Sequence, residues 1–219
     1  MNASPYENRL RQGLAQMDVS LDDQKITQLL NYLEQLIKWN KAYNLTAIKD
    51  GLEMVDRHLL DSLSLLPFLA QALQSEQPPK RLIDVGTGAG LPGMVLAIIY
   101  PELQVVLLDS NGKKTRFMFQ ASIHLGLKNV EVENNRVEKY SPAEKFDIVT
   151  SRAFASLEDM IQGAQHLLAN NGEYWAMKGV YPEAELASCE NKILDAQIHP
   201  LNVANCEGER HLVMAKNIN

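Results

Sequence analysis

Residues Ile83-Asp84-Val85-Gly86-Thr87-Gly88-Ala89-Gly90-Leu91-Pro92-Gly93 say most about the architecture of this chain. The apolar start predicts a strand with an acid near its end, and a glycine-rich loop follows. Glycines let a backbone approach a ligand closely, because no Cβ stands in the way. Pro92 suits the first turn of a helix, where its missing N–H costs nothing. A strand, a glycine loop and a helix in this order are where α/β proteins hold nucleotide-like cofactors.

Strands and helices alternate on the carboxyl-terminal side of Pro79. Strands are expected at 81–85, 104–109, 130–132, 146–151 and 172–177, with two more between 193 and 216. Helices are expected at 92–100 and 113–125, and a further capped helix begins at Ser156. This alternation predicts an α/β fold with a doubly wound, mostly parallel sheet.

The first 75 residues have a helical pattern instead. Apolar residues recur at helical spacing between Ile26 and Ile37, after a start at 20–23 that resembles a capping box. The polar and aromatic stretch 39–46 breaks this pattern, and further helix is expected from 55 to 73, kinked or divided by Pro67. Because consecutive prolines do not sit inside a helix, we expect a helical cap at 1–77 and a second domain at 78–219.

Composition narrows the class of protein. Hydrophobic residues make up 46% and charged residues 22%, which is ordinary for a soluble globular protein. No apolar run is long enough to span a membrane, and residues 1–7 lack the pattern of a signal peptide. Cys189 and Cys206 have no CxxC spacing, which argues against zinc and favours free thiols in a reducing, cytoplasmic setting. The histidines show no ligand spacing, so no metal is proposed.

The glycine loop allows more than one cofactor. Residues 88–93 match G-x-G-x-x-G, which alone fits NAD or FAD. The carboxylate of Asp84, two residues before Gly86, would repel the negative charge of a pyrophosphate. It suits the positively charged amino group of a methionine moiety instead, which favours S-adenosylmethionine. Asp109, 19 residues after Gly90, can accept hydrogen bonds from a ribose diol of either cofactor. A nicotinamide-dependent enzyme, or a turn needed only for packing, remain the alternatives at this point.

A series of motifs in one order carries a resemblance to a known family. These motifs are 39–46 (WNKAYNLT), 57–62 (RHLLDS), the 84–93 loop, 107–110 (LLDS), Ser151-Arg152-Ala153 and Lys178-Gly179. From about Leu21 to Lys216 the chain resembles the glucose-inhibited division protein B family. The resemblance implies a Rossmann-like methyltransferase fold with a seven-stranded sheet and an N-terminal helical cap. It also implies methyl transfer from S-adenosylmethionine to N7 of a guanine in 16S ribosomal RNA.

The resemblance also implies site residues and partners. It places S-adenosylmethionine on Gly86, Leu91, Val137, Glu138 and Arg152, and Asp109 matches the family's acidic strand end. The glycine-loop pattern itself adds Asp84 and Gly88 as cofactor contacts. The implied partner is 16S ribosomal RNA in the 30S subunit or an assembly intermediate, with no membrane and no DNA.

Guanine N7 carries a lone pair and no proton, so its methylation needs proximity and alignment rather than a general base. We therefore assign no catalytic residue. Arg152 is either a contact to guanine O6 or phosphate, or only a surface ion pair. A protein that binds S-adenosylmethionine and assists ribosome assembly without catalysis is the alternative function. The net charge of −6 argues against a broad surface for nucleic acid, but local basic candidates exist: Lys38, Lys41, Arg57, His58, Lys113, Lys114, Arg116, Lys178, Arg210 and His211.

Overall fold

A seven-stranded sheet forms the centre of the computed structural model, which describes residues 4–152, 154, 156–189 and 191–218. Ala153 of the Ser151-Arg152-Ala153 motif and residues 1–3 of the amino-terminal segment lie outside the described residues. The strands are β1 (Arg81–Val85), β2 (Gln104–Leu108), β3 (Val130–Glu133), β4 (Phe146–Ser151), β5 (Leu168–Lys178), β6 (Ile193–Pro200) and β7 (His211–Asn217). Their order is β3-β2-β1-β4-β5-β7-β6, and only β7 runs antiparallel to both of its neighbours. The expected mostly parallel α/β sheet is confirmed.

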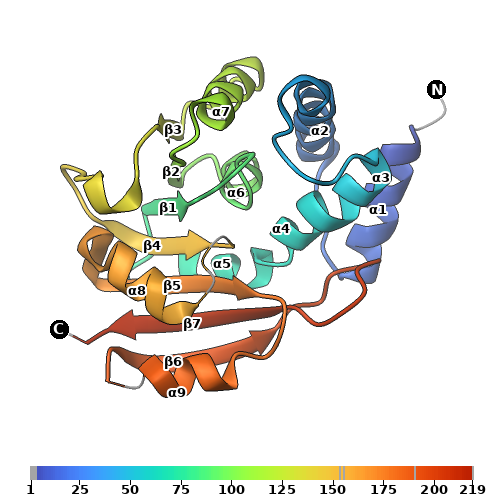
Figure 1. Ribbon diagram of the computed structural model, residues 1–219. Coiled ribbons are helices and arrows are strands. Elements are labelled where there is room, and N and C mark those ends of the chain that lie inside the picture. Colours follow the sequence, from blue (N-terminus) through green and yellow to red (C-terminus); the bar gives the residue numbers. More distant parts are fainter. Residues whose placement is uncertain (1–3, 153, 155, 190, 219) are drawn as a thin grey trace.

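Helices cover both faces of the sheet (Figure 1). The helices α5 (Leu66–Leu73), α6 (Gly93–Ile99) and α7 (Gly112–His124) lie on one face, and α8 (Leu157–Ala164) and α9 (Glu183–Cys189) lie on the other. Successive strand residues point to opposite faces. Leu82 and Trp175 accordingly belong to the hydrophobic cluster of the first face, and their neighbours Ile83 and Tyr174 belong to the cluster of the second.

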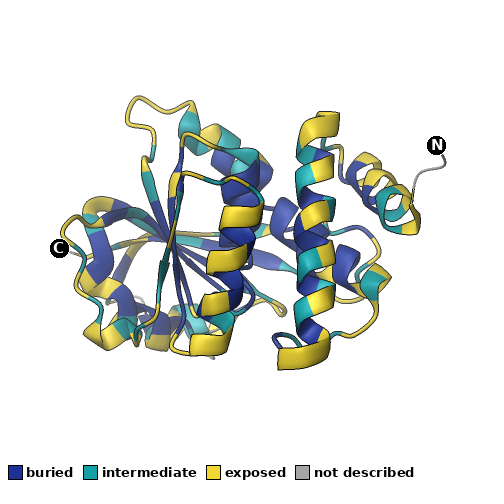
Figure 2. Ribbon diagram, turned by 90° about the horizontal axis from the view of Figure 1, so that it is seen from above, coloured by how far each residue is buried: buried dark blue, intermediate teal, exposed yellow. Residues whose placement is uncertain are grey.

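The amino-terminal helices pack beside the sheet. They are α1 (Pro5–Gln16), α2 (Asp23–Tyr43), α3 (Gly51–Met54), the π-helical segment η1 (Val55–Leu60) and α4 (Asp61–Leu63). Two short 3₁₀ turns, η2 (Val137–Lys139) and η3 (Gln165–Leu167), complete the elements. Seen from above, these helices turn their buried sides inward and their exposed sides to solvent (Figure 2). The division of the chain at residue 77 stays a prediction.

Helix α2 differs from the sequence expectation at both ends. Its N-cap is Asp22, whose carboxylate accepts a hydrogen bond from the Lys25 N–H at 2.7 Å, rather than Ser20. The expected break at Trp39 was wrong, because the helix continues to Tyr43. Trp39 packs on Phe117 of α7 with ring centroids 5.8 Å apart, so tertiary packing stabilises the last turn.

Other expectations concern short elements. Pro67 lies in the first turn of α5, and it divides the expected helix as predicted. Helix α9 was not predicted, and β5 begins four residues before the expected 172.

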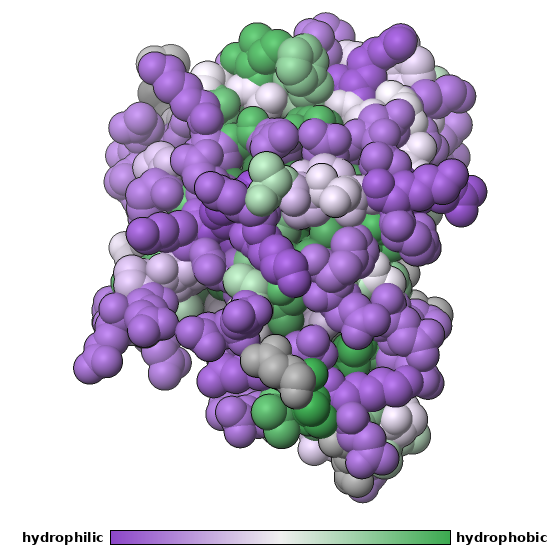
Figure 3. All heavy atoms as spheres, turned by 90° about the vertical axis from the view of Figure 1, so that its left-hand side faces the viewer, coloured by the Kyte–Doolittle hydropathy of each residue, from purple (hydrophilic) through white to green (hydrophobic). Residues whose placement is uncertain are grey.

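Cys189 and Cys206 are free thiols, as expected. Within the described residues, no helix has both the length and the apolar character needed to cross a membrane. The face drawn in Figure 3 is mostly hydrophilic, with small separate hydrophobic patches.

Glycine is needed at the positions of the loop for two different physical reasons. Gly86, Gly88 and Gly90 have φ angles of 65°, 66° and 98°, a left-handed region that side chains rarely adopt. Gly93 begins α6, and a Cβ there would lie 2.4 Å from Leu107 Cδ2 and 2.9 Å from Asp84 Cβ. The first three glycines therefore shape the loop, and Gly93 lets α6 approach the sheet.

Replacing Gly93 by alanine should lower the free energy of unfolding by about 2 kcal/mol, because the new methyl group overlaps two buried side chains. Urea denaturation measures this change. The matched control is Gly112→Ala at the start of α7, where the nearest atom to a new Cβ, Asn134 Oδ1, is 3.7 Å away. That variant should keep the wild-type stability or gain less than about 1 kcal/mol. Equal stability of the two variants would contradict the packing argument.

Candidate functional site

A pocket of about 210 Å³ lies over the glycine loop. Its lining residues are Leu45, Thr46, His58, Gly86, Thr87, Gly88, Ala89, Leu91 and Arg152. They come from three places: the loop after β1, the residue after β4, and the amino-terminal helical region. The carboxyl edge of a parallel sheet is where α/β proteins bind ligands. The pocket therefore combines the expected edge of the sheet with a wall from the helical region.

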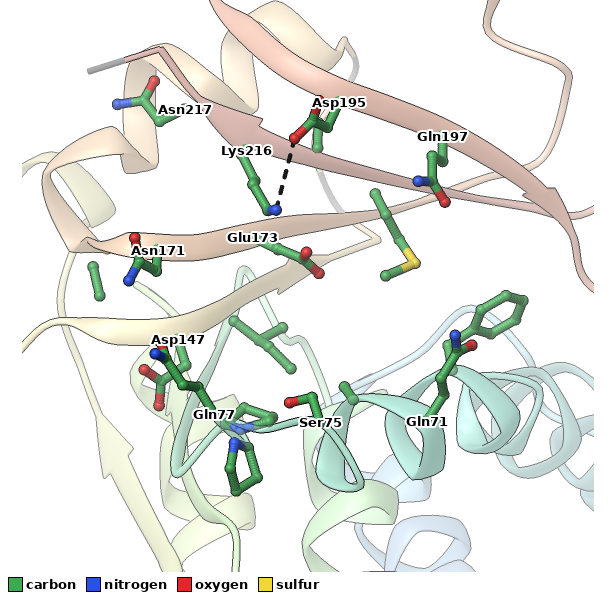
Figure 4. A pocket seen from close by; sticks show the side chains of 18 of the residues that line it. Gln71, Ser75, Gln77, Asp147, Asn171, Glu173, Asp195, Gln197, Lys216 and Asn217 are labelled. Carbon is green, nitrogen blue, oxygen red and sulfur yellow. Dashed lines mark ion pairs between the residues drawn. The ribbon is translucent and has the colours of Figure 1, made fainter.

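A larger cavity of about 1600 Å³ lies elsewhere, between α5 and the strands β5, β7 and β6 (Figure 4). Asp147 near the start of β4 and Asn171 near the start of β5 line it, together with the ion pair between Lys216 and Asp195 at 3.7 Å. This cavity is at the amino ends of the parallel strands. It contains none of the site residues expected from the sequence, so the smaller pocket is the candidate site.

Asp84 lies fully buried beneath the loop. Its Oδ2 atom accepts hydrogen bonds from Thr87 Oγ1 and from the Gly93 N–H, the latter at 2.8 Å, and so joins the two ends of the loop. Burial raises the pKa of Asp84 to about 6, although these two hydrogen bonds and the Arg152 charge act in the opposite direction. Among the described residues, no group donates a hydrogen bond to the buried Oδ1 atom. The 210 Å³ pocket does not include Asp84 in its lining, so a contact of this carboxylate to a ligand stays a prediction.

Asp109 follows β2 and holds the middle of the loop. Its Oδ2 atom accepts a hydrogen bond from the Gly88 N–H at 2.9 Å, and its Oδ1 atom accepts one from the Asn111 N–H at 2.8 Å. Lys114 Nζ lies 3.7 Å from Oδ2. Each carboxylate oxygen can accept more than one hydrogen bond, so Asp109 keeps capacity for a hydroxyl group. Its role toward a ribose stays a prediction.

Arg152 forms part of the pocket wall and is also ion-paired. Its Nη1 atom lies 2.6 Å from Asp61 Oδ2 and donates a longer hydrogen bond of 3.4 Å to the Arg57 carbonyl oxygen. Asp61 is buried. The ion pair expected as the alternative role of Arg152 therefore exists, but with a buried partner and at the pocket.

Val137 and Glu138 lie in η2, after β3. Val137 is half-buried in the hydrophobic cluster on the α8 face, and Glu138 is exposed. The 210 Å³ pocket does not include either residue in its lining. Their contact to a cofactor stays a prediction.

Five lining residues were not assigned to the cofactor site from the sequence: Thr87 and Ala89 of the glycine loop, and Leu45, Thr46 and His58 of the helical region. His58 Nδ1 lies 3.1 Å from the Arg57 carbonyl oxygen, and its Nε2 lies 2.9 Å from Thr46 Oγ1. Burial, followed by the Arg152 charge, lowers the pKa of His58 to about 4, so the ring is neutral at neutral pH. Because a carbonyl can only accept, Nδ1 carries the proton and Nε2 accepts from Thr46. The only sequence signal was that both segments occur among the motifs of the series.

Helix α2 supports the loop from outside the pocket. The fully buried Tyr32 donates a hydrogen bond from its hydroxyl group to the Ala89 carbonyl oxygen at 2.7 Å. A residue more than fifty positions upstream thus fixes the backbone of the loop.

Several basic candidates for RNA contact already have acidic partners. Arg57 pairs with Glu53 at 3.0 Å, Lys178 with Glu185 at 2.8 Å, and Arg210 with Asp61 at 3.4 Å. Lys38, Lys41, Lys113 and Arg116 are exposed. An RNA contact of any of these residues stays a prediction.

Comparison with known proteins gives one family. The family model of rRNA small subunit methyltransferase G (GidB) matches residues 25–213. The protein of that name from Cellvibrio japonicus is 53% identical over 211 residues, covering 96% of this chain and 95% of that protein. Its counterpart from a Marinomonas species is 50% identical over 205 residues, covering 94% and 95%.

Solved structures agree on the fold. The N-methyltransferase NodS from Bradyrhizobium japonicum, in complex with S-adenosyl-L-homocysteine, superposes with a TM-score of 0.58 at 13% identity, covering 86% of this chain and 100% of that one. The tRNA (m1A58) methyltransferase TrmI from Aquifex aeolicus has a TM-score of 0.57 at 14% identity, covering 73% and 69%. With a family match over most of its length and relatives about half identical, the chain belongs to the GidB family, that of rRNA small subunit methyltransferase G.

Proposed function

We propose that this protein transfers the methyl group of S-adenosylmethionine to N7 of a guanine in 16S ribosomal RNA, within the small subunit or an assembly intermediate. The main support for this proposal is the glycine-loop pocket, which lies above a buried carboxylate in a chain of the GidB family. The acceptor Asp84 Oδ1 fits an ammonium group better than a phosphate, because two anions would repel one another.

The residues proposed to hold the methyl donor surround this loop. Gly86, Gly88 and Leu91 supply the floor of the pocket, Asp84 receives the ammonium group, and Asp109 receives the ribose hydroxyls. Val137 and Glu138 are proposed for the adenine and Arg152 for the outer wall. Each of these roles is part of the proposal.

S-adenosylmethionine, when bound, supplies an electrophilic methyl group on a positively charged sulfur. Guanine N7 has a lone pair and no proton, so no side chain has to remove one. The pocket agrees with this chemistry, because the Nε2 lone pair of neutral His58 is already engaged by Thr46. The work left to the chain is alignment of the two reactants and exclusion of water.

Methyl transfer is tested with purified protein, labelled S-adenosylmethionine, and either 30S subunits or naked 16S ribosomal RNA. One labelled N7-methylguanine per RNA is expected, and borohydride and aniline treatment should cleave the RNA at that single position. Deleting the gene should remove this cleavage site from cellular 16S RNA. Binding of S-adenosylmethionine without transfer to any of these substrates would instead favour the non-catalytic assembly factor.

The affinity for S-adenosylmethionine should depend on pH through Asp84. Because the folded-state pKa of Asp84 is about 6 and the ammonium group requires the ionised carboxylate, the Kd should be constant above pH 6. Below that pH the Kd should rise about tenfold per unit, since protonation of Asp84 competes with binding. Calorimetry between pH 5 and 7.5 measures this.

The control for the pH experiment is Asp84→Asn, which should bind more weakly and show no rise in Kd toward pH 5. In the unliganded protein the pKa of Asp84 is raised, so a neutral side chain is compatible with the fold. A wild-type Kd that stays constant from pH 5 to 7.5 would show that Asp84 does not receive the ammonium group.

A further inference from the structure

Asp61 is a buried carboxylate next to the pocket that the proposed methyl-donor site does not use. It is 5% exposed and begins α4, directly after the π-helical segment η1. Its Oδ2 atom lies 2.6 Å from Arg152 Nη1, and its Oδ1 atom lies 3.4 Å from Arg210 Nε. One carboxylate thus joins the helical region to the end of β4 and to the segment before β7.

The ion pair restricts the Arg152 side chain. An arginine at the end of a strand has many rotamers, and a charge-assisted hydrogen bond to a buried carboxylate selects among them. Arg152 is also a lining residue of the glycine-loop pocket. Since Arg210 engages the other oxygen of Asp61, the carboxylate has a cation on each side and its position is fixed as well. The orientation of the pocket wall therefore depends on Asp61.

Asp56 offers a built-in comparison. It lies on η1, is 6% exposed, and also pairs with one arginine, Arg9, at 2.8 Å. Its Oδ1 atom also accepts a hydrogen bond from Asn205 Nδ2 at 3.2 Å. Asp56 thus resembles Asp61 in burial and charge, but its partners do not line the pocket. A π-helical segment alters which residues share a helix face, and such segments are common at functional sites.

We propose that Asp61 is a positioning residue for methyl transfer. It holds the Arg152 guanidinium against the glycine-loop pocket, and Arg210 holds the carboxylate from its other side. This proposal deepens the proposed function and rests on it, because its readout is methyl transfer to the 30S subunit.

The test is Asp61→Asn, which keeps the size of the side chain and removes its charge. We expect kcat for methyl transfer to fall at least about tenfold, the effect of losing a hydrogen bond between charged groups. The KM for 30S subunits should stay within about twofold, because both arginines keep their positive charge. The control Asp56→Asn should keep kcat within about twofold of the wild-type value, when the rate is divided by the concentration of folded protein. Urea denaturation gives the folded fraction of each variant.

A double-mutant cycle with Arg152→Ala separates positioning from a general structural effect. If Asp61 acts through Arg152, adding D61N to R152A should lower kcat no further. Losses that add fully would overturn the proposal, and so would equal kcat values for D61N and D56N. If D61N does not fold, D61E replaces it, with a lower kcat and an unchanged KM expected, because its carboxylate is displaced by one methylene.

The outcomes separate the two proposals. An active wild type with an equally active D61N would overturn the positioning role alone. A wild type that transfers no methyl group to 30S subunits or to 16S RNA would overturn the proposed function, and the role of Asp61 with it.

Discussion

The hydrogen bonds of the Asp84 carboxylate hold together the part of the molecule from which the site is built. One oxygen of Asp84 joins Thr87 to the first residue of α6, and the loop between them has to follow a left-handed path that glycines permit. The absence of a Cβ at Gly93 then lets α6 approach β2. The same burial raises the pKa of Asp84 and leaves its second oxygen as an acceptor. The side chain that supports the loop is thus also the one proposed to receive the ammonium group of the methyl donor.

The pocket is not a property of the sheet alone. Tyr32 fixes the loop from α2, His58 and Thr46 form a neutral wall, and Asp61 ties Arg152 to the helical region. The helical region therefore forms part of the site, because it supplies one wall of the pocket and a hydrogen bond to the loop. If the methyl donor binds as proposed, a shift of these helices would change the orientation of the donor relative to the target base.

Local patterns in the sequence predicted most of the sheet. Strand β1 matches its expected residues, because an apolar run between Pro79 and a glycine loop has few alternatives. Contacts between distant segments were not predictable in this way. The end of α2 depends on Phe117, and the places of Thr46 and His58 at the pocket depend on how the helical region docks. The glycine loop was predictable because its functional residues are consecutive in the sequence. The contact of Asp61 with Arg210 was not, because about 150 positions separate the two residues.

The place of the last strand has a consequence for synthesis of the protein. Strand β7 follows β5 and β6 in the sequence but lies between them, so it is inserted into the sheet rather than added at its edge (Figure 1). Arg210, just before β7, is also the second partner of Asp61. During synthesis, β5 and β6 therefore have no strand between them, and Asp61 lacks Arg210, until residues 210–217 have left the ribosome. A chain that stops before His211 would lack an interior strand of the sheet.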